Sequence, residues 1–279
     1  MNIAFSPCPN DTFVFHAWVH GLIPGAPKLD VTYADIDITN NWAARGEGPE
    51  VLKVSYAALP WVLDRYALLP CGGALGRGCG PLVLTNNSEA SAIGPASLAG
   101  KRVAVPSERS TAYLLFRLWA AEQIPGGVGE IVVMPFHHIM PAVRDGKIDA
   151  GLVIHEARFT YMNYGLTMLA DMGSWWESTT GLPIPLGAII ARRSLDLVAL
   201  SGWVRQSVRY GWEHPEASRP YVREHAQEMD PQVAQQHIQL YVNEFTESLG
   251  DSGYAAIESL LGRAAEEGLV PSFDLALLR

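Results

Sequence analysis

The sequence predicts an α/β fold with two lobes, and three observations lead to this prediction. With 279 residues, of which 48% are apolar and 18% charged, the chain is long enough for two modest hydrophobic cores. The run 150–154 is apolar on both faces, as in a strand buried within an α/β sheet. At 51–66 and again at 102–120, a strand is followed by a helix whose start carries hydroxyl groups.

The charge balance narrows the range of partners. The net charge is −9 at pH 7 and the pI is near 5.3, whereas nucleic acid or an anionic membrane would require a basic face. The sequence shows neither a signal-peptide pattern nor an apolar run of the roughly eighteen residues that a membrane span needs. We therefore expect a soluble, cytoplasmic protein that binds a small molecule, and its oligomeric state stays open.

The three cysteines, Cys8, Cys71 and Cys79, are odd in number and lack C-x-x-C spacing. Neither a disulfide framework nor a zinc site is indicated, so we interpret them as buried thiols. Cys8 has a second interpretation as a reactive residue, because a thiolate could be stabilised just before a predicted helix start.

In the first lobe, three strands each lead through a short loop into a helix. The strands are predicted at 2–5, 31–36 and 51–54, and the helices at 12–20, 39–45 and 56–66. The side chains that could cap these helices are Asn10 or Asp11, Thr39 or Asn40, and Ser55. Because N–H groups at a helix N-terminus attract carboxylates, Ser55 is either a plain cap or part of an anion site. His16 and His20 lie one helical turn apart but lack further ligands, so surface or hydrogen-bonded histidines are favoured over a metal site.

The segment 71–81 is rich in glycine and leads into a strand at 82–85. It lacks a P-loop or dinucleotide-binding pattern, so we expect either a close approach of backbones or a loop that changes direction. The breaker-rich segment 86–98 is the predicted boundary between the lobes. A strand at 188–192 rejoins the first lobe, and helices predicted at 195–213, 215–226, 231–242 and 252–267 form a C-terminal tail. One lobe is thus expected to contain 1–84 and 187–279, and the other 85–186.

The second lobe is expected to contain strands at 102–105, 131–134, 150–154 and 166–170. Ser110 and Thr111 follow the first of these strands and begin a helix. Together with backbone N–H groups, their hydroxyls would form an anion cradle, although Ser110 alone is more simply a cap. The loop 171–187 carries Trp175 and Trp176, which suits a lid or a crossover, with plain packing expected for at least one of them.

His155 is the best chemical candidate in the sequence. It follows the buried strand 150–154, and ligands of open α/β sheets bind beyond the carboxyl ends of strands. Imidazole is also the side chain that ordinarily titrates nearest neutral pH. His137 and His138 rank below it, because paired histidines beside proline and phenylalanine are more often found at the edge of a lobe.

Two lobes joined by two crossings, near Leu84 and near Leu186, resemble the type II periplasmic-binding-protein fold. A closer resemblance rests on motifs in the same order from residue 3 to about 192: S-P-C-P-N-D-T-F, K-V-S-Y-A-A, G-G-A-L-G-R-G-C-G-P-L-V, S-T-A-Y, G-L-V-I-H-E-A-R-F-T-Y and W-W-E-S-T-T-G-L-P-I-P-L-G. Together they resemble the 1,4-dihydroxy-6-naphthoate synthase family of menaquinone biosynthesis by the futalosine route.

This resemblance implies a lyase that converts cyclic dehypoxanthine futalosine, a carboxylated aromatic compound, into 1,4-dihydroxy-6-naphthoate without a cofactor. His155 would be the general base, acting in a cleft between the lobes. The residues implied or expected to bind the substrate are Lys53, Val54 and Ser55, Ser110 and Thr111, and Asn10 and Asp11. The family often has Thr-Thr where this chain has Ser110-Thr111. Arg77, Arg109 and Arg158 are further candidate charge partners.

Two alternatives stay open at this point. Chorismate dehydratase shares the fold and the pathway, although the I-H-E histidine and the G-G-A-L-G-R-G run favour the synthase. A non-catalytic cytoplasmic solute-binding protein would use His155 only as a ligand contact or as a core residue. Binding without turnover would favour this second alternative.

Overall fold

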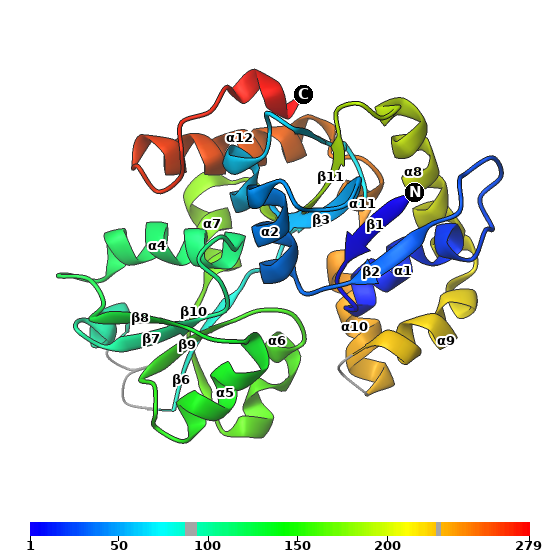
Figure 1. The fold of residues 1–279 in the computed structure, drawn as a ribbon. Helices are drawn as coiled ribbons and strands as arrows, with labels where there is room; N and C mark the ends of the chain where they lie inside the picture. Colours follow the sequence, from blue (N-terminus) through cyan, green and yellow to red (C-terminus); the bar gives the residue numbers. More distant parts are fainter. Residues whose placement is uncertain (87–93, 227–229) are drawn as a thin grey trace. The chain divides into compact units, whose positions relative to one another are not determined.

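The computed structural model describes residues 1–86, 94–226 and 230–279, which form two compact units (Figure 1). Unit 1 comprises Met1–Gly76 and Pro185–Arg279, and unit 2 comprises Arg77–Ile184. The predicted lobe boundary differs at 77–84, because the strand at 82–85 is hydrogen-bonded within the sheet of unit 2. Part of the predicted boundary segment, 87–93, lies outside the described residues.

Unit 1 contains a mixed six-stranded sheet in the order β2-β1-β3-β11-β4, with β5 paired to β11. Its strands are β1 (Asn2–Phe5), β2 (Asp30–Tyr33), β3 (Val51–Ser55), β4 (Tyr66–Leu68), β5 (Ala74–Gly76) and β11 (Ile184–Arg192). β1 runs parallel to both β2 and β3, whereas β11 is antiparallel to β3 and β4. The return strand predicted at 188–192 is confirmed and begins earlier, at Ile184.

Helices account for most of the remainder of unit 1. They are α1 (Pro9–Val19), α2 (Ile36–Arg45), η1 (Tyr56–Trp61), α8 (Leu197–Glu213), α9 (Pro215–His225), α10 (Pro231–Tyr241), α11 (Glu244–Glu247), α12 (Gly250–Glu266) and η4 (Leu275–Leu278). α1 packs against α8, α9 and α10, and the core between these helices and the sheet includes the stacked rings of Phe5 and Phe15 (Figure 1). The predicted helical tail is confirmed, and it holds α1 in place.

Unit 2 is built on a five-stranded sheet in the order β10-β6-β9-β7-β8. Its strands are β6 (Leu82–Thr85), β7 (Arg102–Val105), β8 (Glu130–Val133), β9 (Ala150–Val153) and β10 (Thr167–Asp171). Its helices are η2 (Pro95–Leu98), α4 (Thr111–Gln123), α5 (Phe136–Arg144), α6 (Ala157–Thr160), η3 (Tyr161–Tyr164) and α7 (Met172–Thr180). α4 and α5 cover opposite faces of the sheet (Figure 1).

β9 is held tightly against α5. A Cβ atom on Gly151 would lie 2.4 Å from Cγ2 of Ile139 and 2.9 Å from Cγ2 of Val143, so only glycine fits this approach. All four residues of β9 are buried, as the apolar run predicts. The direction in which the chain leaves β9 is therefore well fixed.

Three helix starts differ from the predictions. α1 begins at Pro9 after Cys8, because proline favours the first helical position, so Asn10 and Asp11 lie inside the first turn and do not cap it. α2 begins at Ile36, three residues before the predicted cap Thr39. The segment after Ser55 forms a short 3-10 helix, and Ser55 makes no capping hydrogen bond to it.

The segment 171–187, predicted as a lid or crossover loop, instead begins with helix α7. The side chain of Asp171 caps this helix by accepting hydrogen bonds from the backbone N–H groups of Gly173 and Ser174. Trp176 is fully buried and donates from Nε1 to the carbonyl of Pro183, which confirms a packing role for one of the two tryptophans. Trp175 donates instead to Glu122 of α4.

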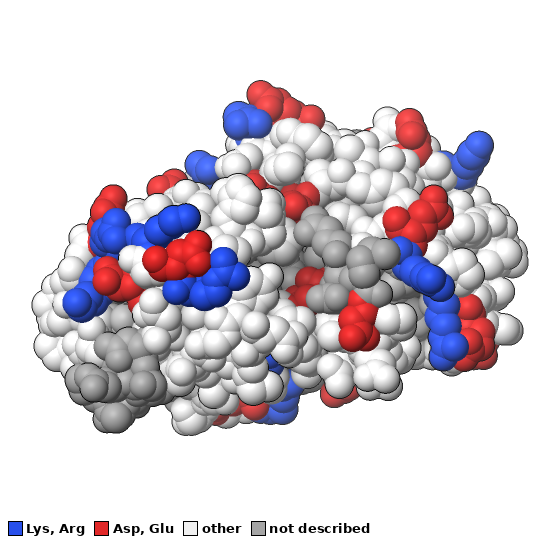
Figure 2. All heavy atoms as spheres, turned by 90° about the horizontal axis from the view of Figure 1, so that it is seen from below, with Lys and Arg blue, Asp and Glu red and all other residues white. Residues whose placement is uncertain are grey.

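The distribution of charge and the hydropathy of the helices can be compared with the partners that the sequence excludes. On the face shown in Figure 2, Lys and Arg side chains lie among Asp and Glu side chains and form no single basic patch. Among the described helices, none combines the length and the hydropathy that a membrane crossing requires.

Candidate functional site

In unit 1, polar residues gather at the carboxyl edge of the sheet. β1 and β3 are parallel neighbours, so Ser6, which follows β1, and Ser55, which ends β3, lie at the same edge. The chain then turns from Ser6 into α1, whose first turn carries Asn10 and Asp11. This is the edge at which open α/β sheets bind ligands.

A buried ion pair lies at the centre of this edge. Lys53 Nζ donates to Asp11 Oδ1 at 2.7 Å, with side-chain exposures of 4% and 3%. Asp11 also accepts from Ser6 Oγ at 2.9 Å and from Asn10 Nδ2 at 2.8 Å, while Lys53 donates to the Gly72 carbonyl at 3.4 Å. Each buried charge thus has an opposite charge and further hydrogen bonds, which offset its desolvation.

The backbone of β11 shapes the space around Lys53. A Cβ atom on Gly187 would lie 2.8 Å from Cε of Lys53, so the absence of a side chain at 187 leaves the stem of the lysine its path to Asp11. Val54, between Lys53 and Ser55, is buried and paired with Ala188 in the sheet. The K-x-S turn therefore occupies a fixed position at the end of β3.

Ser55 is held by two hydrogen bonds to Asn40, a residue predicted as a possible helix cap. The Asn40 side chain donates from Nδ2 to Ser55 Oγ at 3.0 Å and accepts from the Ser55 backbone N–H at 2.7 Å. Asn40 was predicted as a possible cap of α2, but it lies in the middle of that helix. Among the described residues, no acceptor is found for the hydroxyl proton of Ser55, so that proton can be donated to a ligand.

His237 is the member of this region that the sequence analysis missed. It lies on α10, is 1% exposed, and its Nε2 is 2.9 Å from Oδ1 of Asn10. We refer to Ser6, Asn10, Asp11, Lys53 and His237 as the unit 1 network. The only signal in the sequence was a histidine within an amphipathic helix, and its partner lies 227 positions away.

In unit 2, the corresponding edge carries the predicted hydroxyl turn. β7 and β9 are parallel neighbours, so the loop after β7 and the turn after β9 lie at one edge of the sheet. Ser110 caps α4: its Oγ accepts from the Tyr113 backbone N–H at 3.1 Å and donates to the Ser107 carbonyl at 2.9 Å. Ser110 is therefore a cap, as the simpler interpretation predicts, and Thr111 is buried at the first position of the helix.

His155 follows β9 with an unusual backbone conformation. Its φ is 57°, and among the described residues it is the only non-glycine residue with a positive φ. Such a left-handed conformation is unfavourable for most L-residues and is often found at functional sites. The Phe136 ring contacts the imidazole edge-on, with the ring centroids 5.2 Å apart.

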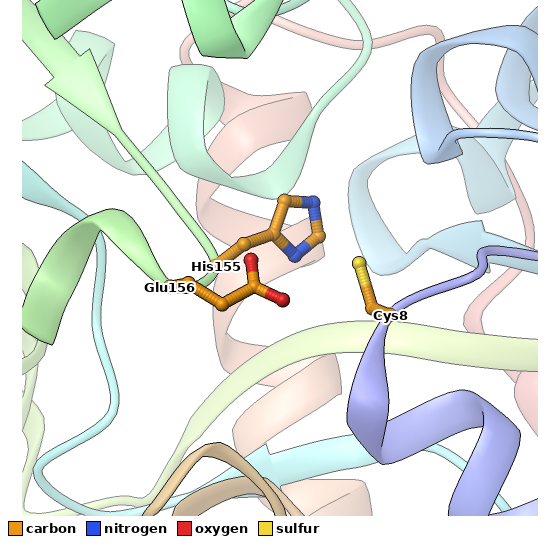
Figure 3. A group of neighbouring side chains, drawn as sticks. All are labelled: Cys8, His155 and Glu156. Carbon is orange, nitrogen blue, oxygen red and sulfur yellow. The ribbon is translucent and has the colours of Figure 1, made fainter. Parts of the chain in front are cut away.

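Glu156 places an acidic group close to the imidazole. It is buried, and a carboxylate oxygen lies within 4.8 Å of a ring nitrogen of His155. Figure 3 shows both side chains immediately beyond the end of β9.

Arg158, in the same turn, is held by a second ion pair. Its guanidinium donates to Asp171 Oδ2 at 2.6 Å and to the Gly80 carbonyl at 2.7 Å, and both side chains are largely buried. Arg158 therefore ties the turn after β9 to the start of α7. Arg77 is paired with Glu177 and donates to the Gly181 carbonyl.

The remaining candidates can be placed briefly. Arg109 lies in the loop between β7 and α4, where its backbone N–H donates to Ser107 Oγ at 3.3 Å. His137 and His138 are exposed in the first turn of α5. His20 is exposed and hydrogen-bonded to the His16 carbonyl, whereas His16 is buried and its pKa is lowered to about 4, chiefly by burial.

The cysteines match the prediction of buried thiols. Cys8, Cys71 and Cys79 are buried and form no disulfide bonds in the described residues, and Cys8 lies immediately before α1 (Figure 3). Burial raises the pKa of the Cys71 thiol to about 11 and that of Cys79 to about 12. These two thiols stay protonated at neutral pH and are not nucleophiles.

Comparisons with known proteins agree with this description. A family model described as menaquinone biosynthesis matches residues 1–266. A 1,4-dihydroxy-6-naphthoate synthase of Streptomyces coelicolor is 74% identical over 275 residues, which is 98% of this chain and 95% of the relative. A synthase of the same name from Thermus thermophilus is 45% identical over 273 residues, which is 96% of this chain and 95% of the relative.

Solved structures add the fold. The alkanesulfonate-binding protein of Xanthomonas axonopodis pv. citri aligns with a TM-score of 0.72 at 15% identity, covering 98% of this chain and 94% of that chain. The two α/β units and these neighbours define a protein with the periplasmic-binding-protein-like fold, as predicted. Within that class, the chain belongs to the menaquinone biosynthesis family, and it is an enzyme.

Proposed function

We propose that the chain is a 1,4-dihydroxy-6-naphthoate synthase, a lyase that converts cyclic dehypoxanthine futalosine into 1,4-dihydroxy-6-naphthoate and a sugar-derived fragment. The identity of 74% to a relative of that name, over nearly the whole of both chains, supports this reaction. Cys8, Cys71 and Cys79 form no disulfide bonds with one another, which suits a reducing compartment, so we place the reaction in the cytoplasm.

The observation that carries the proposal is the conformation of His155. A residue held at φ 57°, at the carboxyl edge of a buried strand, costs free energy that the surrounding structure must offset. The Gly151 approach and the Arg158–Asp171 ion pair, on either side of the turn, supply that support. We propose that this conformation serves to present the imidazole to the substrate as a general base.

In the proposed reaction, His155 removes a proton from the substrate and the elimination that follows generates the aromatic naphthoate. The Glu156 carboxylate stabilises the imidazolium that forms, and the Phe136 ring fixes the plane of the imidazole. Aromatisation supplies the driving force for the elimination. The step requires a base and an enclosed polar environment, and no redox change occurs.

Polar groups of the substrate would be held by the residues predicted for this purpose. The hydroxyl of Ser55 and the first turn of α4, with Thr111, are the proposed donors to its oxygen atoms. Asn10 contributes its amide, while Asp11, Lys53, Val54 and Ser110 hold these donors in position by the contacts described above.

The decisive experiment is incubation of the purified protein with cyclic dehypoxanthine futalosine, with detection of 1,4-dihydroxy-6-naphthoate by mass spectrometry. Chorismate is the comparison substrate, because a chorismate dehydratase would consume it and leave the futalosine derivative unchanged. Binding of the futalosine derivative without product would instead identify a solute-binding protein. Either result would overturn the proposed reaction.

His155→Ala is expected to lower kcat by about 10²- to 10⁴-fold, the usual contribution of a general base, while binding of the futalosine derivative remains measurable. The matched control is His138→Ala, which removes an exposed histidine from the same unit and should retain wild-type turnover. Wild-type kcat in the His155→Ala variant would show that another group is the base.

A further inference from the structure

The hydrogen bonds of the unit 1 network determine the orientation of one amide. The carboxylate of Asp11, paired with the Lys53 ammonium, can only accept hydrogen bonds. The atom of Asn10 that faces Asp11 at 2.8 Å must therefore be the donor Nδ2, and its Oδ1 must face the other way. The Asn10 amide thus has a single orientation that satisfies its carboxylate neighbour.

The same reasoning fixes the proton on His237. Nε2 of His237 lies 2.9 Å from Oδ1 of Asn10, and an amide oxygen can only accept. Nε2 must therefore carry a proton and donate it to Asn10. A chain of donors and acceptors runs from α10 through Asn10 to the ion pair beneath the first turn of α1.

One proton of Asn10 remains for a ligand. Its Oδ1 is engaged by His237 and one Nδ2 proton by Asp11, and among the described residues no acceptor takes the second Nδ2 proton. Asn10 is 8% exposed, more than any other member of the unit 1 network, so it is the member nearest to solvent. The group that it can bind is an acceptor, such as a carboxylate or carbonyl oxygen.

We propose that His237 is a positioning residue that locks the amide of Asn10 so that its second Nδ2 proton is presented to an acceptor oxygen of the substrate. The identity of the substrate in this inference rests on the proposed function. The fixed orientation of the Asn10 amide does not depend on it. Without the donor at Nε2, Asp11 still holds one Nδ2 proton, but Oδ1 loses its partner and the amide can swing about that single hydrogen bond, so the second Nδ2 proton is no longer held toward the substrate. A residue of the C-terminal helices thereby sets the specificity of a turn near the N-terminus.

The first test needs no activity. In protein labelled with ¹⁵N-histidine, the nitrogen spectrum is expected to show a proton on Nε2 of His237, and Asn10→Leu should shift that resonance. A His237 ring protonated only on Nδ1 would overturn the proposal. Because this result does not depend on turnover, it tests the orientation of the amide independently of the proposed lyase activity.

The second test compares His237→Gln with His237→Leu. The amide nitrogen of glutamine can occupy nearly the position of Nε2 and donate, whereas leucine fills the space without donating. We expect the leucine variant to raise KM for cyclic dehypoxanthine futalosine by about 3- to 10-fold, as loss of one hydrogen bond would do, and the glutamine variant to stay within about 2-fold of wild type.

Equal KM values in folded glutamine and leucine variants, whether wild-type or raised, would show that His237 acts through packing alone and would overturn the proposal. If the leucine variant does not fold, His237→Met is the replacement comparison, and the nitrogen spectrum of the wild-type protein still decides the orientation of the amide.

Discussion

Both units place polar groups at the carboxyl edge of their sheets. They differ in whether an ion pair or a single ionisable side chain lies at the centre of that edge. In unit 1, Asp11 and Lys53 neutralise each other at 2.7 Å, and the groups left for a ligand are the neutral donors of Asn10 and Ser55. In unit 2, the ion pair of Arg158 and Asp171 lies to one side, and the ionisable His155 is itself held in a left-handed conformation.

Under the proposed function, this difference would divide substrate binding and chemistry between two similar scaffolds. A satisfied, buried ion pair is a rigid support for neutral hydrogen-bond donors, because neither charged side chain can easily move. A strained residue whose turn is anchored by an ion pair can instead present a reactive side chain. We therefore expect the two ion pairs to respond differently to removal.

Asp11→Asn should produce the largest effect on stability. It leaves the Lys53 ammonium buried without its opposite charge, which is expected to lower the free energy of unfolding by about 3–5 kcal/mol. Denaturant unfolding at pH 7 measures this change. The matched control, Asp64→Asn, removes a carboxylate that is 72% exposed beside Arg65 and should change stability by less than about 0.5 kcal/mol. Equal values for the two variants would contradict the supporting role of the unit 1 ion pair.

Arg158→Met should have a smaller effect on stability, about 2–3 kcal/mol, because Asp171 keeps its hydrogen bonds to the start of α7. Its effect on catalysis should be specific: kcat falls while KM changes little, because the turn that positions His155 is loosened. Arg144→Met, which removes an arginine that is 51% exposed, is the control. A variant with reduced stability and unchanged kcat would show that this ion pair supports only the fold.

The smallest effect that we predict is the response of unit 1 to acid. The pKa of buried His16 is about 4, against 6.5 for an accessible histidine, so the unfolded chain binds the extra proton more readily between these values. The contribution of neutral His16 is complete above pH 6.5 and is lost as the pH falls toward 4, with a loss of about 2 kcal/mol reached near pH 5. Denaturant unfolding at pH 7.0, 5.5 and 4.5 should show this loss in the wild type and less of it in His16→Phe. Parallel stability curves for the two proteins would contradict this assignment.

Local patterns predicted most of the strands, but not the short strands β4 and β5. The ranges 2–5, 82–85 and 102–105 match β1, β6 and β7, because each is a short apolar run bounded by polar or proline residues. The position of His155 at the end of a buried strand could also be predicted, because it depends only on the neighbouring residues 150–154. Its left-handed backbone could not, since nothing in the local sequence demands it.

Contacts between distant parts of the chain were beyond local reasoning. Asparagine often caps helices. Asn40 instead hydrogen-bonds to Ser55, fifteen positions away, because the α2 helix starts earlier. His237 has an ordinary helical setting, and only the packing of α10 against α1 gives it a partner. Helix α7 was predicted as a loop because it contains glycine, serine and threonine, which are poor helix formers. The capping residue Asp171 was not recognised.

The path of the chain through the two units has a consequence for its synthesis. Unit 2 is one continuous stretch, Arg77–Ile184, whereas the sheet of unit 1 needs β11 to join β3 to β4, and β11 is translated after unit 2. We expect unit 2 to be able to fold while the chain is still being made, and unit 1 to wait for its last strand and helices. The unit that carries His155 is therefore expected to fold during translation, before the sheet of unit 1 is complete.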